Sequence, residues 1–239
     1  MIDFLKKKLQ RTPDVDAGFM SQRRQILNDN MPFATKEAYR TLRTNVRFAL
    51  QGTGCKKFCI TSSSQGEGKS ITMLNLAITF AETGQRVLLI DADLRRPAVS
   101  RLLVEKATPG LSNILAGLAT EQEALRKNVY PNLDIIFSGD IPPNPTELLD
   151  SDRMRELLDR LSMRYDYILL DTPPVNIVSD ACVIGNMLDG VLILARQGRS
   201  RKESLKRAVD HLQLAGAKIL GCIFNGVPNE VRTTYSYYE

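Results

Sequence analysis

The sequence predicts an α/β fold in which a mostly parallel central sheet is covered by helices on both faces. From residue 57 onward, short runs rich in Ile, Leu and Val alternate with longer segments of helical periodicity, a pattern typical of such a sheet. The length of 239 residues, 43% of them hydrophobic, suits one domain with a sizeable core. The expected strands are residues 58–61, 87–91, 133–137, 167–171, 191–195 and 219–224.

The segments between these runs are long enough to form helices that return the chain across the sheet in the right-handed sense. The clearest are residues 69–83, 147–163 and 201–215. Another amphipathic helix is expected over residues 36–50, where Ala38, Leu42 and Val46 form one apolar stripe.

The two ends of the chain differ from this α/β body. Residues 1–31 have no clear apolar period, so we predict an N-terminal arm there and a domain over residues 32–228. Residues 229–239 follow the last expected strand, have neither a helical nor a strand period, and are predicted to form a tyrosine-rich tail.

The net charge of +5 is unevenly distributed along the chain. The first 50 residues carry ten basic and five acidic side chains, so the remainder is neutral overall. This distribution favours a neighbouring subunit, an activator at an anionic membrane surface or an acidic tail as the partner. We do not expect a nucleic-acid partner.

The sequence has no recognisable targeting signal and no metal-type cysteine spacing, and both observations lead us to expect a cytosolic protein. No run approaches the roughly 18 apolar residues of a membrane-spanning helix, and the three lysines follow the first apolar residues, opposite to the order in a secretory signal. The four cysteines lack zinc-type pairing, so we expect free, buried thiols. They are Cys55, Cys59, Cys182 and Cys222.

The strongest local signal is the glycine-containing loop at residues 63–70, between an expected strand and an expected helix. Glycines at positions 66 and 68 allow successive backbone N–H groups to converge on phosphate oxygens at a helix N-terminus. Lys69 can then reach the β and γ phosphates, and Ser70 offers a hydroxyl to Mg²⁺. This is the context of a P-loop, although Ser63 occupies the first glycine position; the alternative is a chance match in a surface turn. The predicted nucleotide-binding residues of the loop are Gly66, Glu67, Gly68, Lys69 and Ser70.

Carboxylates end two of the expected strands. Asp91 and Asp93 follow the second strand, and Asp171 ends the fourth, directly before Thr-Pro-Pro. The carboxyl ends of parallel strands meet where such sheets bind ligands, so these groups can hold Mg²⁺ or accept a proton. The alternative for the first pair is a helix cap or an ion pair with Arg95 or Arg96.

These three elements together resemble the bacterial tyrosine kinases, or BY-kinases, which control capsular and exopolysaccharide export. The resemblance runs from about residue 35 to the C-terminus and includes residues 139–149, which are similar to the family's segment before a long helix. It implies an ATP- and Mg²⁺-dependent protein-tyrosine kinase on a P-loop NTPase fold. Asp91 would be the catalytic base, although Asp91 and Asp93 could exchange roles, and Lys69 would assist.

The resemblance also assigns ligands. Ser70 would bind Mg²⁺, with Asp93 and Asp171 holding it through water. Asn225, directly after the last expected strand, is placed as in related ATPases to meet the adenine edge; a turn Asn before Gly226 is the alternative.

Two further motifs imply self-association. The spacing of Glu37, Arg40 and Arg43 fits the family's E-x-x-R-x-x-R oligomerisation motif, and the alternative is an ordinary helix-surface pair. The terminal tyrosines match its autophosphorylated cluster, modified in trans. These phosphoacceptors are Tyr235, Tyr237 and Tyr238.

Further partners and the location follow from the same resemblance. We expect a ring of subunits, a cognate tyrosine phosphatase and a membrane activator whose cytosolic tail completes the site. The kinase would thus lie at the inner face of the cell membrane.

The main alternative is a MinD/ParA-type ATPase that acts in positioning or partition. It shares the fold and the three elements, but its loop carries an extra lysine where this chain has Ser64. That departure favours a kinase. It also leaves Lys69 to stabilise transition-state charge, with a basic residue from a neighbouring subunit as a candidate helper.

Overall fold

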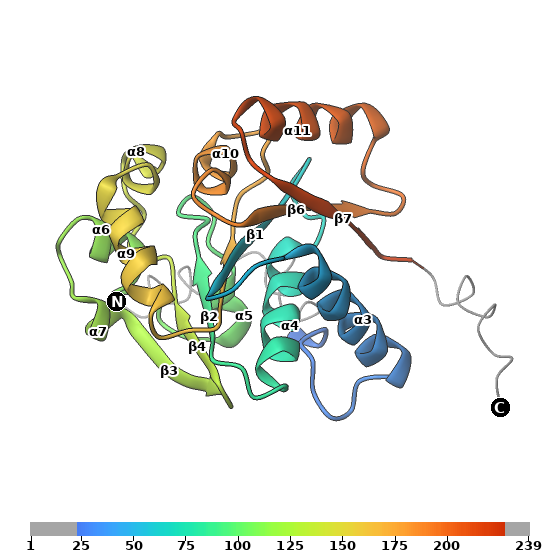
Figure 1. The fold of residues 1–239 in the computed structure, drawn as a ribbon, viewed down its shortest axis with the longest axis horizontal. Coiled ribbons are helices and arrows are strands. Elements are labelled where there is room, and N and C mark those ends of the chain that lie inside the picture. The colour runs from blue at the N-terminus through green and yellow to red at the C-terminus, as the bar shows by residue number, and fades with distance from the viewer. Residues whose placement is uncertain (1–22, 228–239) are drawn as a thin grey trace, which may run out of the picture.

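A seven-stranded sheet forms the centre of the computed structural model, which describes residues 23–227. Its strands, in sheet order, are β3 (Leu125–Tyr130), β4 (Leu133–Ile136), β2 (Val87–Asp91), β5 (Tyr167–Asp171), β1 (Lys56–Ser62), β6 (Gly190–Arg196) and β7 (Ile219–Asn225). Six of them run in the same direction, and the edge strand β3 runs antiparallel to its neighbour β4. The predicted α/β class is therefore confirmed (Figure 1).

Helices cover both faces of this sheet (Figure 1). On one face lie α3 (Phe33–Ala49), α4 (Lys69–Ala81) and α5 (Val99–Leu103). The other face carries α6 (Leu111–Leu115), α8 (Pro145–Leu149), α9 (Asp152–Ser162), α10 (Asp180–Gly185) and α11 (Lys202–Leu214), and the short α7 (Glu121–Ala124) precedes β3.

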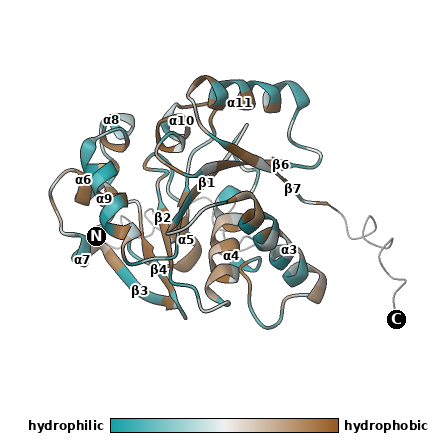
Figure 2. Cartoon of the chain, viewed as in Figure 1, coloured by the Kyte–Doolittle hydropathy of each residue, from teal (hydrophilic) through white to brown (hydrophobic). Residues whose placement is uncertain are grey.

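Alternation along β1 separates the two hydrophobic cores. Phe58 and Ile60 belong to the cluster under α3, α4 and α5, whereas Cys59 between them belongs to the cluster under the other helices. All three side chains are fully buried. Figure 2 shows the resulting pattern, with hydrophobic strands inside and hydrophilic outer helix faces. Burial on both faces explains why these strands are continuous apolar runs.

One predicted helix and one edge strand differ from the sequence prediction. The single helix expected over 147–163 is two helices, because the chain turns at Asp150 and Ser151 and the Ser151 hydroxyl accepts a hydrogen bond from Met154 N (3.3 Å), capping α9. Strand β3 was not predicted. It is a half-exposed edge strand without the apolar run that marks the buried strands.

The residues before α3 pack against α4. Ile26 and Leu27 are buried in the core cluster. The Asn75 side chain on α4 accepts a hydrogen bond from Leu27 N (2.9 Å) and donates one to Gln25 O (2.8 Å). The last residues of the predicted arm therefore lie on the domain. The predicted boundary at residues 31 and 32 stays a prediction, and residues 1–22 and the tail lie outside the described residues.

The cysteines are free, as expected, but only Cys59 is buried. Cys55 and Cys182 are half-buried and Cys222 is exposed, so the expectation of buried thiols was wrong for these three. Among the helices formed by residues 23–227, none has the length and apolar character needed to cross a bilayer.

Candidate active site

The loop between β1 and α4 requires its two glycines. Gly66 has φ +71° and Gly68, which precedes the first residue of α4, has φ +102°. A Cβ atom on Gly68 would lie 2.5 Å from Nδ2 of Asn225, and one on Gly66 would lie 2.8 Å from Nη2 of Arg199. The positive φ therefore favours glycine at both positions, and the contact with Asn225 adds a steric restriction at Gly68, as a loop that wraps around phosphates needs.

Asp91 and Asp171 meet at the carboxyl ends of β2 and β5. They are register partners across this parallel pair, and both are fully buried. The Asp91 carboxylate accepts hydrogen bonds from Val99 N (3.1 Å) and Asp93 N (3.3 Å). Burial raises the pKa of Asp91 well above its usual value, and the nearby charges of Asp171 and Asp93 raise it further. Asp91 thus anchors the start of α5 and also belongs to an acidic cluster.

Among residues 23–227, no donor reaches either buried oxygen of Asp171 with good hydrogen-bond geometry, although the Ser70 hydroxyl is close enough to lower the pKa of this carboxyl. Burial raises the pKa of Asp171 to about 7, nearby Lys69 and Ser70 lower it, and Asp93 raises it. A buried carboxylate normally has donors or a cation. Its bare oxygens beside Lys69 and Ser70 therefore fit a hydrated Mg²⁺ ion.

Direct coordination by a ring of carboxylates does not fit the geometry. Within the described part of the chain, no three acidic, His or Cys side chains are close enough together to hold a metal ion. Mg²⁺ commonly keeps several of its waters in nucleotide sites. The arrangement accordingly suits a metal bound mainly through water and phosphate.

The loop after β2 is fixed by side chains of α8 and α10. Arg95 forms a bidentate ion pair with the fully buried carboxylate of Asp180 on α10, at 2.9 and 3.2 Å. Thr146 on α8 accepts a hydrogen bond from Arg95 (2.9 Å) and donates one to Asp180 (2.6 Å). Asp93 in the same loop accepts from Arg96 N (2.9 Å). The segment 139–149 thus helps to fix the loop that carries Asp93.

Sequence reasoning missed this ion pair and one further set of contacts. Glu67 is fully buried in the phosphate loop, where it accepts hydrogen bonds from Ser63 Oγ, Ser64 N and Ser200 Oγ. Ser200 and Arg95 reach their partners across 133 and 85 residues. No local spacing signals such pairs.

Asn225, at the end of β7, contacts the phosphate loop. Its amide donates to Glu67 O (3.0 Å), and its Oδ1 accepts from the backbone of the next residue, Gly226 N (2.8 Å). Its contact with adenine stays a prediction.

The three residues of the expected oligomerisation motif lie on α3. Arg40 and Glu37 pair at 2.5 Å, and both are exposed. Arg43 instead turns toward its own domain and donates to Thr79 O (2.8 Å). The helix-surface pair is therefore present, and the interface role of the motif stays a prediction.

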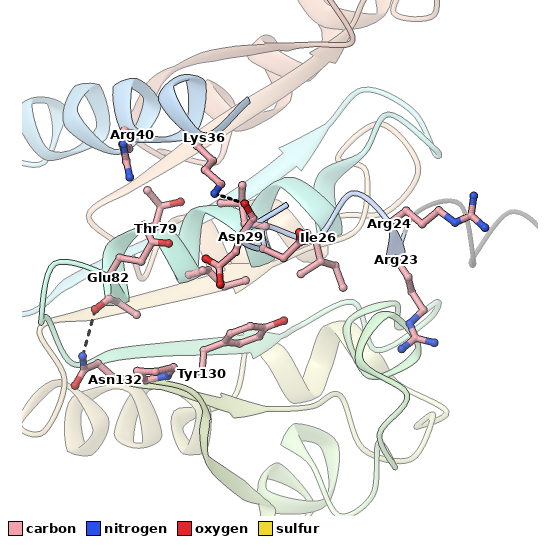
Figure 3. A pocket seen from close by; sticks show the side chains of 15 residues that line it. Arg23, Arg24, Ile26, Asp29, Lys36, Arg40, Thr79, Glu82, Tyr130 and Asn132 are labelled. Atoms are coloured by element: carbon pink, nitrogen blue, oxygen red, sulfur yellow. Dashed lines mark hydrogen bonds between the residues drawn. The ribbon is translucent and has the colours of Figure 1, made fainter. Parts of the chain in front are cut away.

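A cavity bounded by the described residues lies away from these groups, at the opposite end of α4. It has a volume of about 980 Å³ and lies between the segment before α3, the end of α4 and residues 130–132. Its basic side chains do not converge, because Arg23 and Arg24 point away from Lys36 and Arg40 (Figure 3). Lys36 is engaged with Asp29 O at 2.8 Å.

Comparison with known proteins decides the family. Residues 55–199 match the family model AAA_31, described as an AAA domain. Over 221 residues the chain is 40% identical to the tyrosine-protein kinase YwqD of Bacillus subtilis, covering 92% of this chain and 93% of that protein. The chain belongs to the bacterial tyrosine kinases. The resemblance seen in the sequence is thus confirmed, and this BY-kinase is a protein-tyrosine kinase.

Solved structures agree with this assignment. The kinase domain of the Escherichia coli tyrosine kinase Etk has a TM-score of 0.79 at 37% identity and covers 89% of this BY-kinase and 87% of that chain. The septum site-determining protein MinD of Pyrococcus horikoshii, solved with Mg-ADP, has a TM-score of 0.61 at 25% identity, with 75% and 76% covered. Both have the P-loop fold, and the similarity to the kinase is the greater.

Proposed function

We propose that this BY-kinase transfers the γ-phosphoryl group of ATP to Tyr235, Tyr237 and Tyr238 on a neighbouring copy of the chain. Through this modification it would regulate capsular and extracellular polysaccharide synthesis and export. One observation supports the chemistry above all: the Asp171 carboxylate is fully buried beside Lys69 and Ser70, without a well-formed hydrogen bond from the described residues, and is paired in register with Asp91. A phosphate-binding loop next to a buried carboxylate is what ATP and Mg²⁺ together require.

The phosphate loop would bind and orient ATP. Backbone N–H groups of residues 66–70 would donate to the phosphate oxygens, with the positive end of α4 behind them. The Lys69 ammonium would neutralise charge on the β and γ phosphates. Asn225 would meet the adenine edge, since it already packs against the loop.

Mg²⁺ would be held by Ser70 and, through water, by Asp93 and Asp171. When bound, it neutralises the charge that develops on the transferring phosphoryl group.

Asp91 would act as the base. The tyrosine oxygen forms a bond to the γ phosphorus, the bond from that phosphorus to the β–γ bridging oxygen breaks, ADP leaves, and the phenolic proton passes to the Asp91 carboxylate. Burial raises the pKa of Asp91, and a higher pKa brings a carboxylate closer to the working range of a base at neutral pH. Asp93, which is only half-buried, is the other candidate.

Partners would complete the system. Glu37, Arg40 and Arg43 would contact the next subunit of a ring, a membrane activator would supply a cytosolic tail, and a cognate phosphatase would reverse the modification. The kinase would then lie at the inner face of the cell membrane. The family resemblance supports these assignments, as does the concentration of basic residues in the first 50 positions.

A phosphotyrosine assay tests the proposal. Purified protein with ATP and Mg²⁺, with and without an activator tail, should gain phosphotyrosine, and Lys69→Met should abolish it. Replacing all three tail tyrosines by Phe should remove most of the label. ATP hydrolysis without any phosphotyrosine would instead support the MinD/ParA type of activity, and full labelling of the Phe variant would exclude the tail as acceptor.

A further inference from the structure

A fully buried carboxylate lies inside the loop that is expected to bind phosphate. Glu67 has no exposed surface. A buried charge is costly unless hydrogen-bond donors surround it, and a negative charge in an anion-binding loop opposes its ligand. A buried Glu67 carboxylate therefore requires hydrogen-bond donors around it.

Three donors from the described part of the chain surround the Glu67 carboxylate. Ser63 Oγ (3.2 Å) and Ser64 N (3.1 Å) reach the carboxylate from the start of the loop, and Ser200 Oγ reaches it from the segment between β6 and α11. Ser63 is also the residue that replaces the first glycine of the general P-loop pattern. The substitution thus provides a hydroxyl donor that glycine lacks.

Ser200 is itself fixed by its surroundings. Its Oγ accepts from Arg196 N (2.7 Å), and the Arg196 guanidinium donates to Gly66 O (3.3 Å). Asn225 at the end of β7 donates to Glu67 O (3.0 Å). The middle of the phosphate loop is therefore held from outside by the ends of two neighbouring strands.

We infer that Glu67 and Ser200 are positioning residues that hold the phosphate loop in its phosphate-binding conformation before nucleotide arrives. The inference rests on the proposed function, because it concerns binding of ATP at that loop. A loop ordered in advance loses less conformational entropy on binding, and the saving appears as affinity for the phosphate groups. This gain in affinity is the same for the bound substrate and for the transition state, so it changes Kd and leaves kcat unaltered.

Paired variants of the full chain test this assignment. Ser200→Ala removes the hydroxyl that donates to Glu67, whereas Ser200→Thr keeps it. Ser204→Ala, four residues further along in α11, is the matched control, because the hydrogen bonds of Ser204 are with Asn176 and Arg207 and not with the loop. The measurements are the Kd of ADP by calorimetry, kcat at saturating ATP and the melting temperature without nucleotide.

We expect Ser200→Ala to raise the Kd of ADP about tenfold, which corresponds to one lost hydrogen bond to a charged group. Ser200→Thr should remain within about twofold of the wild type, Ser204→Ala should not change, and kcat at saturating ATP should stay within about twofold in all three. If Ser200 only stabilised the fold, Ser200→Ala would lower the melting temperature, and the Kd of ADP would not rise while kcat stayed constant.

Two results would overturn the inference alone: Ser200→Ala binds ADP as tightly as Ser204→Ala, or Ser200→Thr is as weak as Ser200→Ala. If Ser200→Ala does not fold, Ser63→Gly, which removes another donor to Glu67, carries the same expectation and the same refutation. A wild-type protein without affinity for ADP would overturn the proposed function, and the inference with it.

Discussion

Asp91 and Asp171 face each other as register partners on β2 and β5, and neither carboxylate has any exposed surface. Their proximity makes ionisation of one oppose ionisation of the other, and burial opposes both. Ionising both groups therefore lowers the free energy of unfolding.

The contribution of Asp171 to the stability of the nucleotide-free protein should fall as pH rises from about 4 to about 7. Burial raises the pKa of Asp171 from 3.8 to about 7, so over that range the native state binds more protons than the unfolded state. Asp171→Asn should remove the contribution of Asp171 to the slope of the free energy of unfolding against pH. At pH 8 the variant should be more stable than the wild type by a few kcal/mol. Urea denaturation with chelator at pH 5 and pH 8 measures it. The exposed Asp210→Asn is the control, and an unchanged slope in Asp171→Asn would contradict the prediction.

Breaking the ion pair of Arg95 should destabilise the protein. Arg95→Ala leaves the Asp180 carboxylate buried with only Thr146 as a side-chain donor, and we expect a loss of about 2–3 kcal/mol, reduced from the value for a fully buried pair because Arg95 is 37% exposed. Arg155→Ala removes an exposed pair with Asp150 and should cost less than about 1 kcal/mol. Equal losses in urea denaturation would show that the Arg95 pair is no stronger than a surface pair.

Gly68→Ala should weaken ADP binding by about tenfold or more. The substitution places a side chain at positive φ and 2.5 Å from an Asn225 amide that is already hydrogen-bonded. Gly84→Ala is the matched control, since Gly84 also has positive φ but has open space around its Cβ position. Calorimetry should find ADP affinity lost in the first variant and kept in the second. The same affinity in both would mean that close packing at Gly68 is unimportant.

The two candidate bases should respond differently to Mg²⁺. If Asp91 takes the tyrosine proton, Asp91→Asn should lower kcat about 10²–10⁴-fold at every Mg²⁺ concentration. Asp93→Asn should mainly raise the Mg²⁺ concentration needed for half-maximal rate. The initial rate of phosphotyrosine formation against Mg²⁺ separates them, and the reverse pattern would assign the base to Asp93.

The sequence was sufficient for the strands buried on both faces, because their apolar runs are continuous. It failed for β3, whose half-exposed residues carry no such run, and for the turn at Asp150 and Ser151, where polar residues cap a helix inside a helical pattern. It also predicted that the carboxylates ending β2 and β5 would lie together, since carboxyl ends of parallel strands meet at one edge.

The contacts that support the site were beyond sequence reasoning. Ser200 meets Glu67 and Arg95 meets Asp180 only because distant segments fold against each other. Each residue type is ordinary at its position, and its partner is defined by three-dimensional packing alone. The inward-facing role of Glu67 was hidden for the same reason, because glutamate in a loop is usually solvated.

The position of β5 in the sheet also determines at which chain length the phosphate loop and Asp91 can come together during synthesis. This strand lies between β1 and β2, which precede it in sequence and pair with it but not with each other. A nascent chain that ends before Tyr167 lacks the strand that joins the phosphate loop to Asp91. Since such non-local pairings form late in folding, acquisition of the complete site should coincide with closure of the whole sheet.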